Sequence, residues 1–204
     1  MKVQNRPYRT IWTRPDGAAA TIIDQTRLPH EFVTLDLTTV DEAEHAIRAM
    51  LVRGAPLIGA TAAYGMWLAM RADPSDAALD RAASFLLAAR PTAVNLRWAL
   101  EAMTEALRPL PAGDRAAAAL AEAQAIADED VAINSAIGDH GLEVFRAIWR
   151  AKGERGRLNV LTHCNAGWLA TVDWGTALAP IYKAHDVGIP VHVWVDETRP
   201  RNQE

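Results

Sequence analysis

The sequence predicts an α/β protein with a small β-hairpin region, a helical N-terminal domain, and the start of a parallel-sheet domain that is incomplete. Three observations support this prediction. Residues 1–37 alternate polar and β-branched side chains, residues 39–150 repeat apolar side chains at helical intervals, and residues 158–195 read as strand, turn, helix and strand. A crossover helix returns the chain to the same end of the sheet, so the two strands of the last segment are expected to be parallel.

Composition limits the classes of protein that are possible. The chain has 204 residues, is 50% hydrophobic and carries a formal net charge of -4, so neither nucleic acid nor a membrane surface is expected as a partner. The longest uncharged apolar run, Ala55 to Met70, is shorter than a membrane span and predicts a buried helix. A single cysteine and no secretory leader indicate a soluble cytoplasmic protein without an internal disulfide.

The N-terminal region is expected to form a hairpin followed by a third strand. The runs T-I-W and T-I-I-D flank the turn sequence R-P-D-G, and another β-rich run covers residues 32–37. The periodicity then changes, because Thr39 and Glu42 have the spacing of a capping box and the apolar residues that follow recur at helical intervals to about Val52. The helical domain therefore begins at Thr39.

Five further helices are expected before the parallel sheet. Gly54 allows unusual dihedral angles at the end of the first helix, and Pro56 suits the first turn of the next. Gly138 and Gly141 interrupt the last long apolar pattern and predict a break between two helices. The expected helices cover about residues 56–71, 75–90, 93–107, 114–137 and 142–150.

A domain boundary is expected at residues 151–157, A-K-G-E-R-G-R, where a charged, glycine-containing segment separates helical from strand-like sequence. It divides the chain into an N-terminal domain, 1–150, and the beginning of a second domain, 158–204. The second domain is predicted to contain a strand, a helix and a strand at about 158–162, 178–186 and 190–195. Two parallel strands are too few for a stable doubly wound sheet, so this domain is expected to be incomplete.

The candidate reactive residue is Cys164, at the carboxyl end of the first parallel strand and beside a glycine turn. Ligands of open α/β sheets collect at this edge, where Asp196 of the second strand is also expected. A buried structural cysteine is the commoner alternative by composition, but the position favours thiolate or hydrogen-bonding chemistry. His163 should point to the opposite face from Cys164 and is interpreted as structural. The histidines show no ligand spacing, so no metal site is expected.

Four arginines stand at the ends of elements beside glycine or proline: Arg53, Arg90, Arg199 and Arg201. Isolated surface arginines are usually solvated, but a guanidinium binds phosphate through two parallel hydrogen bonds. Several of them converging would make a phosphate site without a P-loop. Glu129, Asp130 and Asn134 share one helical face, which we interpret as a polar seam between helices and not as a catalytic pair.

Four segments in order carry a family resemblance: R-G-A-P-L-I-G at 53–59, R-P-T-A-V-N-L at 90–96, H-C-N-A-G-W-L-A-T at 163–171 and D-E-T-R-P-R-N-Q at 196–203. They resemble the methylthioribose-1-phosphate isomerase family, which also includes the regulatory α, β and δ subunits of the translation factor eIF2B. The resemblance implies a helical N-terminal domain followed by a Rossmann-like domain. The strand–helix–strand segment is then the start of that Rossmann-like domain.

The resemblance also implies an activity. It is the aldose–ketose isomerisation of 5-methylthioribose 1-phosphate to 5-methylthioribulose 1-phosphate in methionine salvage, on a small sugar phosphate, without a cofactor, by a protein expected to be a homodimer when full length. Cys164 matches the catalytic cysteine of the family. The positions that match its substrate-binding residues are Arg53, Gly54, Ala55, Arg90 and Gln203.

The chain departs from the family pattern in three ways. Leu57 stands where alanine is usual, and Trp168 follows the N-A-G turn, so the substrate pocket is expected to differ somewhat. The catalytic aspartate and an Asn-Lys pair of the family would lie beyond residue 204, so this chain alone lacks part of the site. A non-catalytic regulatory subunit like those of eIF2B and a ribose-1,5-bisphosphate isomerase therefore stay open as alternatives.

Overall fold

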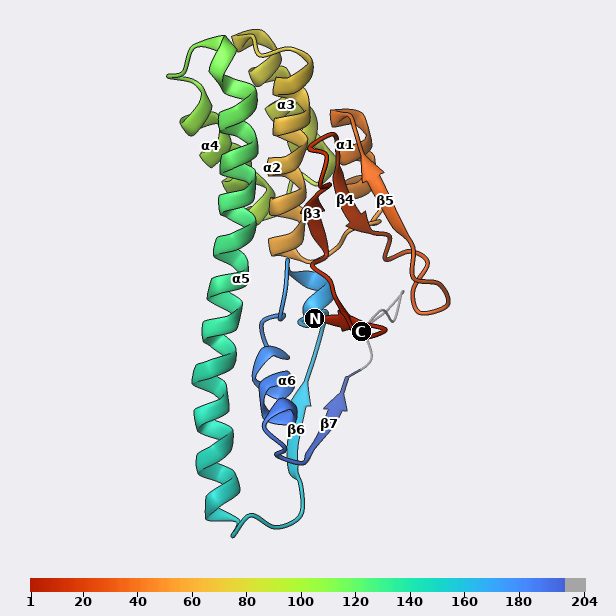
Figure 1. Cartoon of the computed structure of the whole chain (residues 1–204), viewed down its shortest axis with the longest axis vertical. Helices are drawn as coiled ribbons and strands as arrows, with labels where there is room; N and C mark the ends of the chain where they lie inside the picture. The colour runs from red at the N-terminus through yellow and green to blue at the C-terminus, as the bar shows by residue number, and fades with distance from the viewer. Residues whose placement is uncertain (197–204) are drawn as a thin grey trace.

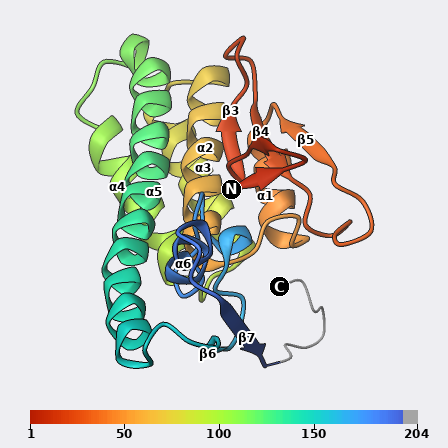
Figure 2. The same ribbon diagram turned by 60° about the horizontal axis from the view of Figure 1, so that its bottom comes forward.

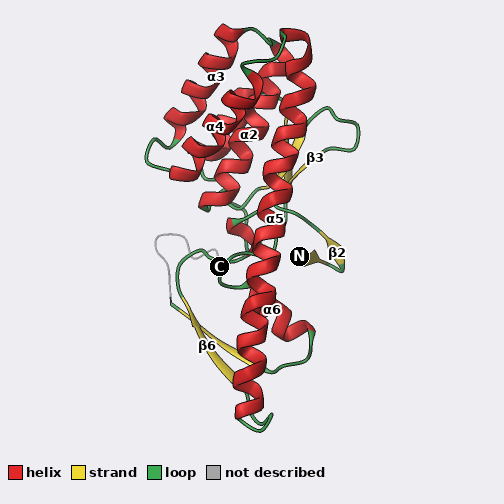
Figure 3. Ribbon diagram, turned by 90° about the vertical axis from the view of Figure 1, so that its left-hand side faces the viewer, coloured by secondary structure: helices red, strands yellow, loops and turns green. Residues whose placement is uncertain are grey.

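The computed structural model describes residues 1–196 of the chain (Figure 1). A helical bundle flanked by a small antiparallel sheet occupies one end of an elongated molecule, and a parallel strand pair with one helix occupies the other. One long helix runs past both parts (Figure 3). The two parts meet near the first turn of the central bundle helix.

The antiparallel region contains a three-stranded sheet in the order β3–β4–β5 and a separate two-stranded hairpin. The strands are β1 Lys2–Val3, β2 Arg6–Pro7, β3 Ile11–Thr13, β4 Ala20–Ile23 and β5 Thr34–Leu37. All four residues of β4 are buried, because this strand lies between two neighbours and against the helices. The predicted hairpin and third strand are confirmed, and the β1–β2 pair is an addition.

Four helices follow: α1 Val40–Arg48, α2 Ala55–Ala72, α3 Asp76–Ala89 and α4 Val94–Leu107. Helix α2 is buried from Leu57 to Met70, as expected of a helix that is apolar on all sides. The predicted caps are confirmed, since the Thr39 and Ser75 side-chain oxygens accept hydrogen bonds from the backbone N–H groups of Glu42 and Ala78, both at 3.2 Å.

The expectation of two helices around Gly138 and Gly141 is wrong. Helix α5, Ala112–Ala151, is continuous over 40 residues. The two glycines face a neighbouring helix instead, because a Cβ atom at Gly141 would lie 2.3 Å from Pro180 Cγ, and one at Gly138 would lie 3.0 Å from Lys183 Cδ. A glycine inside a helix costs about 1 kcal/mol relative to alanine. Here it permits a close helix–helix approach.

The last described elements are β6 Leu158–Thr162, the short 3₁₀ turn η1 Trp168–Ala170, α6 Ala179–Asp186 and β7 Val191–Val195. Strands β6 and β7 pair in parallel, as predicted, and project away from the bundle (Figure 2). A small core of Leu142, Leu158, Ala184 and Ile189 joins them to α5 and α6. Large apolar side chains of both strands, including Leu161 and Trp194, stay exposed.

Candidate functional site

The carboxyl ends of β6 and β7 point toward the end of the bundle where α2 begins (Figure 1). The backbone N–H of Asp196 donates to the Thr162 carbonyl oxygen at 3.1 Å, which ties the two strand ends together. His163 Nδ1 lies 3.4 Å from Asp196 Oδ2. Cys164 follows directly, so the strand ends bring the thiol-bearing residue and the Asp196 carboxylate to the same edge, as the parallel pairing predicted; the His163 imidazole beside Asp196 was not part of that prediction.

Cys164 is exposed, so the alternative of a buried structural cysteine does not hold. Its φ angle is 67°, in the left-handed region that residues other than glycine adopt uncommonly. The sequence predicted that the next helix would begin at about Leu178, and this is confirmed, because α6 begins at Ala179. Between the cysteine turn and α6 the chain forms the short η1 turn, which the sequence did not predict.

The connection between η1 and α6 folds back onto the turn that carries Cys164. Gly175 lies so close to Gly167 that a Cβ atom at Gly175 would be 2.3 Å from the Gly167 carbonyl carbon. Thr176 Oγ1 donates to the Ala166 carbonyl oxygen at 3.3 Å. The cysteine turn therefore rests on the later part of the same loop.

Glycines also bring three of the resembling segments into contact. Gly54, with φ 96°, abuts η1, because a Cβ atom there would lie 2.3 Å from Ala170 Cα. A Cβ atom at Gly59 would lie 2.9 Å from the Asn95 carbonyl oxygen. The R-G-A-P-L-I-G segment thus touches both the cysteine-containing segment and R-P-T-A-V-N-L.

The predicted binding residues occupy element ends. Arg53 precedes α2 and Arg90 is the C-cap of α3, and both are partly exposed. Gly54 is the N-cap of α2 and Ala55 its first residue. Leu57, which stands where the family usually has alanine, is fully buried in the main core, so this difference from the family affects core packing. The residues predicted beyond the second strand lie outside the described part of the chain: Arg199, Arg201 and Gln203.

Three side chains from distant elements hold η1 and the two residues after it, and sequence reasoning missed two of them. Gln25 Nε2 donates to the Leu169 carbonyl oxygen at 2.6 Å, and Thr10 Oγ1 donates to the Thr171 carbonyl oxygen at 2.5 Å. Asp130 Oδ2 accepts a hydrogen bond from the Val172 backbone N–H at 2.7 Å. These partners are backbone groups, which carry no signature in a sequence.

Asp130 has a second partner, because Asn134 Nδ2 donates to its Oδ1 at 2.9 Å. The predicted sharing of one helical face by these two residues is confirmed, but the seam joins α5 to a loop and not to another helix. Burial raises the pKa of the Asp130 carboxyl above its ordinary value, and the hydrogen bonds from Val172 and Asn134 only partly oppose this.

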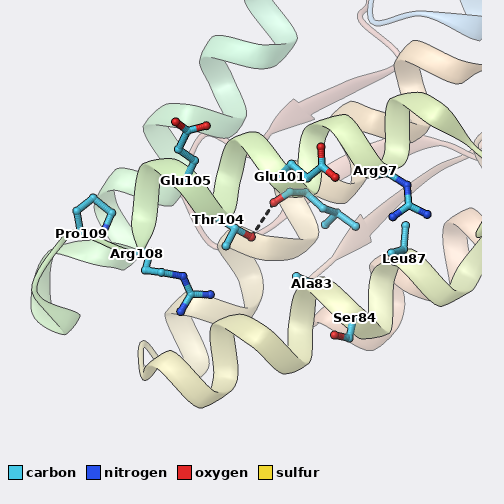
Figure 4. Close-up of a pocket in the computed structure, with 10 residues that line it drawn as sticks. Ala83, Ser84, Leu87, Arg97, Glu101, Thr104, Glu105, Arg108 and Pro109 are labelled. Carbon is cyan, nitrogen blue, oxygen red and sulfur yellow. Dashed lines mark hydrogen bonds between the residues drawn. The ribbon is translucent and has the colours of Figure 1, made fainter.

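A groove of about 670 Å³ lies elsewhere, on the surface between α3 and α4, and none of the predicted site residues within 1–196 lines it (Figure 4). Its charged residues are Arg97, Glu101, Glu105 and Arg108. Among residues 1–196, no group of three or more His, Cys, Asp or Glu side chains is placed to hold a metal ion. Within the same residues, no helix is long and apolar enough to span a membrane.

Comparisons with solved structures support the fold. The chain matches 5-methylthioribose 1-phosphate isomerase from Pyrococcus horikoshii with a TM-score of 0.83 and 36% identity, over 97% of this chain and 55% of that one. It also matches a translation initiation factor eIF-2B delta subunit from A. fulgidus with a TM-score of 0.80 and 38% identity, over 97% and 56% of the two chains. The fold of this chain is therefore one that these two proteins share over about half of their own length.

Sequence comparisons agree. Methylthioribose-1-phosphate isomerase of Rhodospirillum rubrum is 66% identical over all of this chain and 53% of its own length, and that of Methylobacterium nodulans is 66% identical over all of this chain and 55% of its own length. The chain thus spans about half the length of these relatives. The sequence model of the initiation factor 2 subunit family matches residues 51–204. This chain belongs to the initiation factor 2 subunit family.

Proposed function

We propose that this chain forms the N-terminal half of a cytoplasmic isomerase that converts 5-methylthioribose 1-phosphate to 5-methylthioribulose 1-phosphate in methionine salvage. One observation carries the proposal. In a chain 66% identical to relatives of that name, an exposed cysteine follows β6, and its loop is in contact with the Arg53-Gly54-Ala55 turn through Ala170. A thiol and an anion-binding turn are thus neighbours.

We propose that the phosphate group of the substrate binds at the end of the bundle where α2 begins. Helix α2 has 18 residues, and among residues 1–196 no side chain caps its N-terminus at Gly54, so this N-terminus suits an anion. Arg53 immediately precedes it, and Arg90 lies shortly before Asn95, whose carbonyl oxygen faces Gly59 of α2. A guanidinium binds phosphate through two hydrogen bonds. We assign Gln203 to the same substrate site by its place in the family motif.

Cys164 is the proposed catalytic residue. The phosphate on the anomeric oxygen blocks ordinary ring opening, so an acid must assist it before hydrogen moves between C1 and C2. A thiol can donate and accept a proton in such steps, and an exposed position at a strand end lets it reach a sugar. The chemistry needs no cofactor. His163 directly precedes Cys164, and its Nδ1 lies 3.4 Å from Asp196 Oδ2 at the same strand ends.

The parallel pair is proposed to be the start of a Rossmann-like domain that begins after residues 151–157. Leu161, Trp194 and Val195 are 69%, 59% and 54% exposed, and apolar strands of this kind are usually covered on both faces. Further strands and helices of the same protein would bury them. We propose that the complete protein is a homodimer, with no nucleic acid and no membrane as partner.

A chimeric enzyme tests the proposed function. Residues 1–204 are joined to the C-terminal part of the Rhodospirillum rubrum relative that this chain does not match, and formation of the ketose from 5-methylthioribose 1-phosphate is measured. Turnover that disappears in Cys164→Ser supports the proposal. A folded chimera without turnover overturns it. Ribose 1,5-bisphosphate, tested in parallel, separates the two isomerase alternatives.

The likeness to the A. fulgidus delta subunit favours a second candidate, a non-catalytic regulatory role. This role predicts that the folded chimera turns over neither sugar phosphate. It also predicts that the chimera copurifies with translation initiation factors from cell extract. The exposed cysteine favours the isomerase, because a regulatory module requires no thiol at this edge.

A further inference from the structure

We propose that Asp130 of α5 is a positioning residue for Cys164: it fixes the loop on which the cysteine turn rests. The inference deepens the proposed isomerase function and rests on it. It concerns a residue that acts through other residues and not one that touches the sugar phosphate. The argument follows the contacts from the carboxylate to the thiol.

The carboxylate is held on both sides. Asp130 Oδ2 accepts from the Val172 backbone N–H at 2.7 Å, and its Oδ1 accepts from Asn134 Nδ2 at 2.9 Å. Asn134 is buried, with 2% of its surface exposed. Hydrogen bonds to an ionised acceptor are about twice as strong as those between neutral groups. Asp130 therefore anchors Val172 to a rigid helix more firmly than a neutral contact would.

The anchored segment reaches the cysteine turn in three steps. The Gly175 backbone N–H donates to Thr171 Oγ1 at 3.0 Å, which joins the anchored residues to the return part of the loop. Gly175 then lies against Gly167 with no room for a side chain. Only Asn165 and Ala166 separate Gly167 from Cys164 along the chain. A shift of Val172 would therefore reach the thiol.

The backbone conformation of the cysteine turn depends on contacts that hold its loop in place. Cys164 has a left-handed backbone, and residues other than glycine keep this conformation only where their surroundings impose it. Asn165 Nδ2 and Trp168 Nε1 in the same loop are buried without a hydrogen-bond partner among the described residues. Both donors would gain water if the loop opened. The loop is thus predisposed to rearrange once an anchor is lost.

The structure offers a conservative variant. In Asp130→Asn the amide oxygen can still accept from Val172 N–H, and the amide nitrogen then faces Asn134. Asn134 Nδ2 also donates to the backbone carbonyl oxygen of residue 130 at 2.8 Å, which holds the Asn134 amide in its present orientation, so the variant keeps the Val172 contact and loses only the one from Asn134. Asp130→Ala keeps neither contact. The neighbouring Glu129 is exposed, so Glu129→Ala is a control that removes the same charge from the same helix.

The first experiment measures kcat and KM in the chimera described above. Asp130→Ala should lower kcat by at least about tenfold with KM within about threefold, because small displacements of a catalytic group cost rate more than binding. Asp130→Asn should stay within about threefold of the parent in kcat, and Glu129→Ala should match the parent. If Asp130→Ala fails to fold, Thr171→Val, which removes the next link, should reproduce the kcat effect.

The second experiment does not need turnover. Cys164 is the only thiol of the 204-residue chain, so its rate of alkylation by iodoacetamide reports the turn directly. Asp130→Ala should change this rate severalfold, and Asp130→Asn should not. Folded Asp130→Ala with unchanged kcat and unchanged alkylation overturns the proposal, as does equal impairment by Asn and Ala. A parent chimera without turnover instead overturns the isomerase function, and the alkylation rates still decide the role of Asp130.

Discussion

Replacing Gly54 with alanine should cost this chain about 2 to 6 kcal/mol in the free energy of unfolding. Two separate effects add. The φ angle of 96° is unfavourable for a residue with a side chain, at about 1–3 kcal/mol. The new Cβ atom would also lie 2.3 Å from Ala170 Cα, and overpacking of this kind costs about 1–3 kcal/mol more. The second effect acts where the bundle touches the loop after Cys164.

Gly17→Ala is a reference for a positive φ angle without a close contact. Gly17 has a φ angle of 68°, but nothing lies within 4 Å of a Cβ atom built there, so this variant carries only the dihedral cost. Urea unfolding of both variants, followed by circular dichroism, gives the two free energies. Gly54→Ala should lose at least about 1 kcal/mol more than Gly17→Ala. Equal losses would refute the close approach of Gly54 to Ala170.

Three other predictions follow from the site and the fold. In the chimera, Cys164→Ser should lower kcat by at least about 10²-fold with KM within a few-fold, and steady-state kinetics showing an unchanged kcat with a raised KM would assign the thiol to binding. Limited proteolysis of the 204-residue chain should cut within residues 151–157 and beyond Gly188 and leave a resistant helical core; an intact resistant monomer would contradict this. Burial raises the pKa of Asp130 above 3.8, so its contribution to stability is full below that pH and is lost as pH rises through the folded-state pKa. The urea midpoint of Asp130→Asn should therefore rise relative to that of the parent as the pH is raised from 3.8 to neutral. A difference between the two midpoints that does not change with pH would contradict the raised pKa of Asp130.

The elements that local chemistry determines were predictable from the sequence. Thr39 and Ser75 predicted two helix starts, because a hydroxyl followed by the right spacing caps the N–H groups of a first turn. The pairing of β6 with β7 followed from one crossover helix. Each of these features depends on residues close together in the chain, or on a rule of chain topology.

The failures share a physical cause, which is dependence on distant partners. Gly138 and Gly141 look like helix breakers until Pro180 and Lys183 are placed against them. Asp130 looked like a member of an interhelical seam because its main partner is the amide of Val172, and every residue except proline has such an amide. The contact of Gly54 with Ala170 likewise joins segments that are far apart in sequence.

Helix α5 has a mechanical consequence for the proposed enzyme. At 1.5 Å per residue, its 40 residues make a strut about 60 Å long that belongs to both cores. Sharp bends in helices arise at proline, at Gly/Ser pairs or at bulges; α5 has no proline, and its Gly138 and Gly141 are packed against Lys183 and Pro180 of α6. We therefore expect the proposed anion-binding turn and the thiol, which both belong to parts packed against this helix, to keep a fixed separation. Selectivity for the sugar phosphate would then come from a fixed span between these groups, set before the substrate arrives.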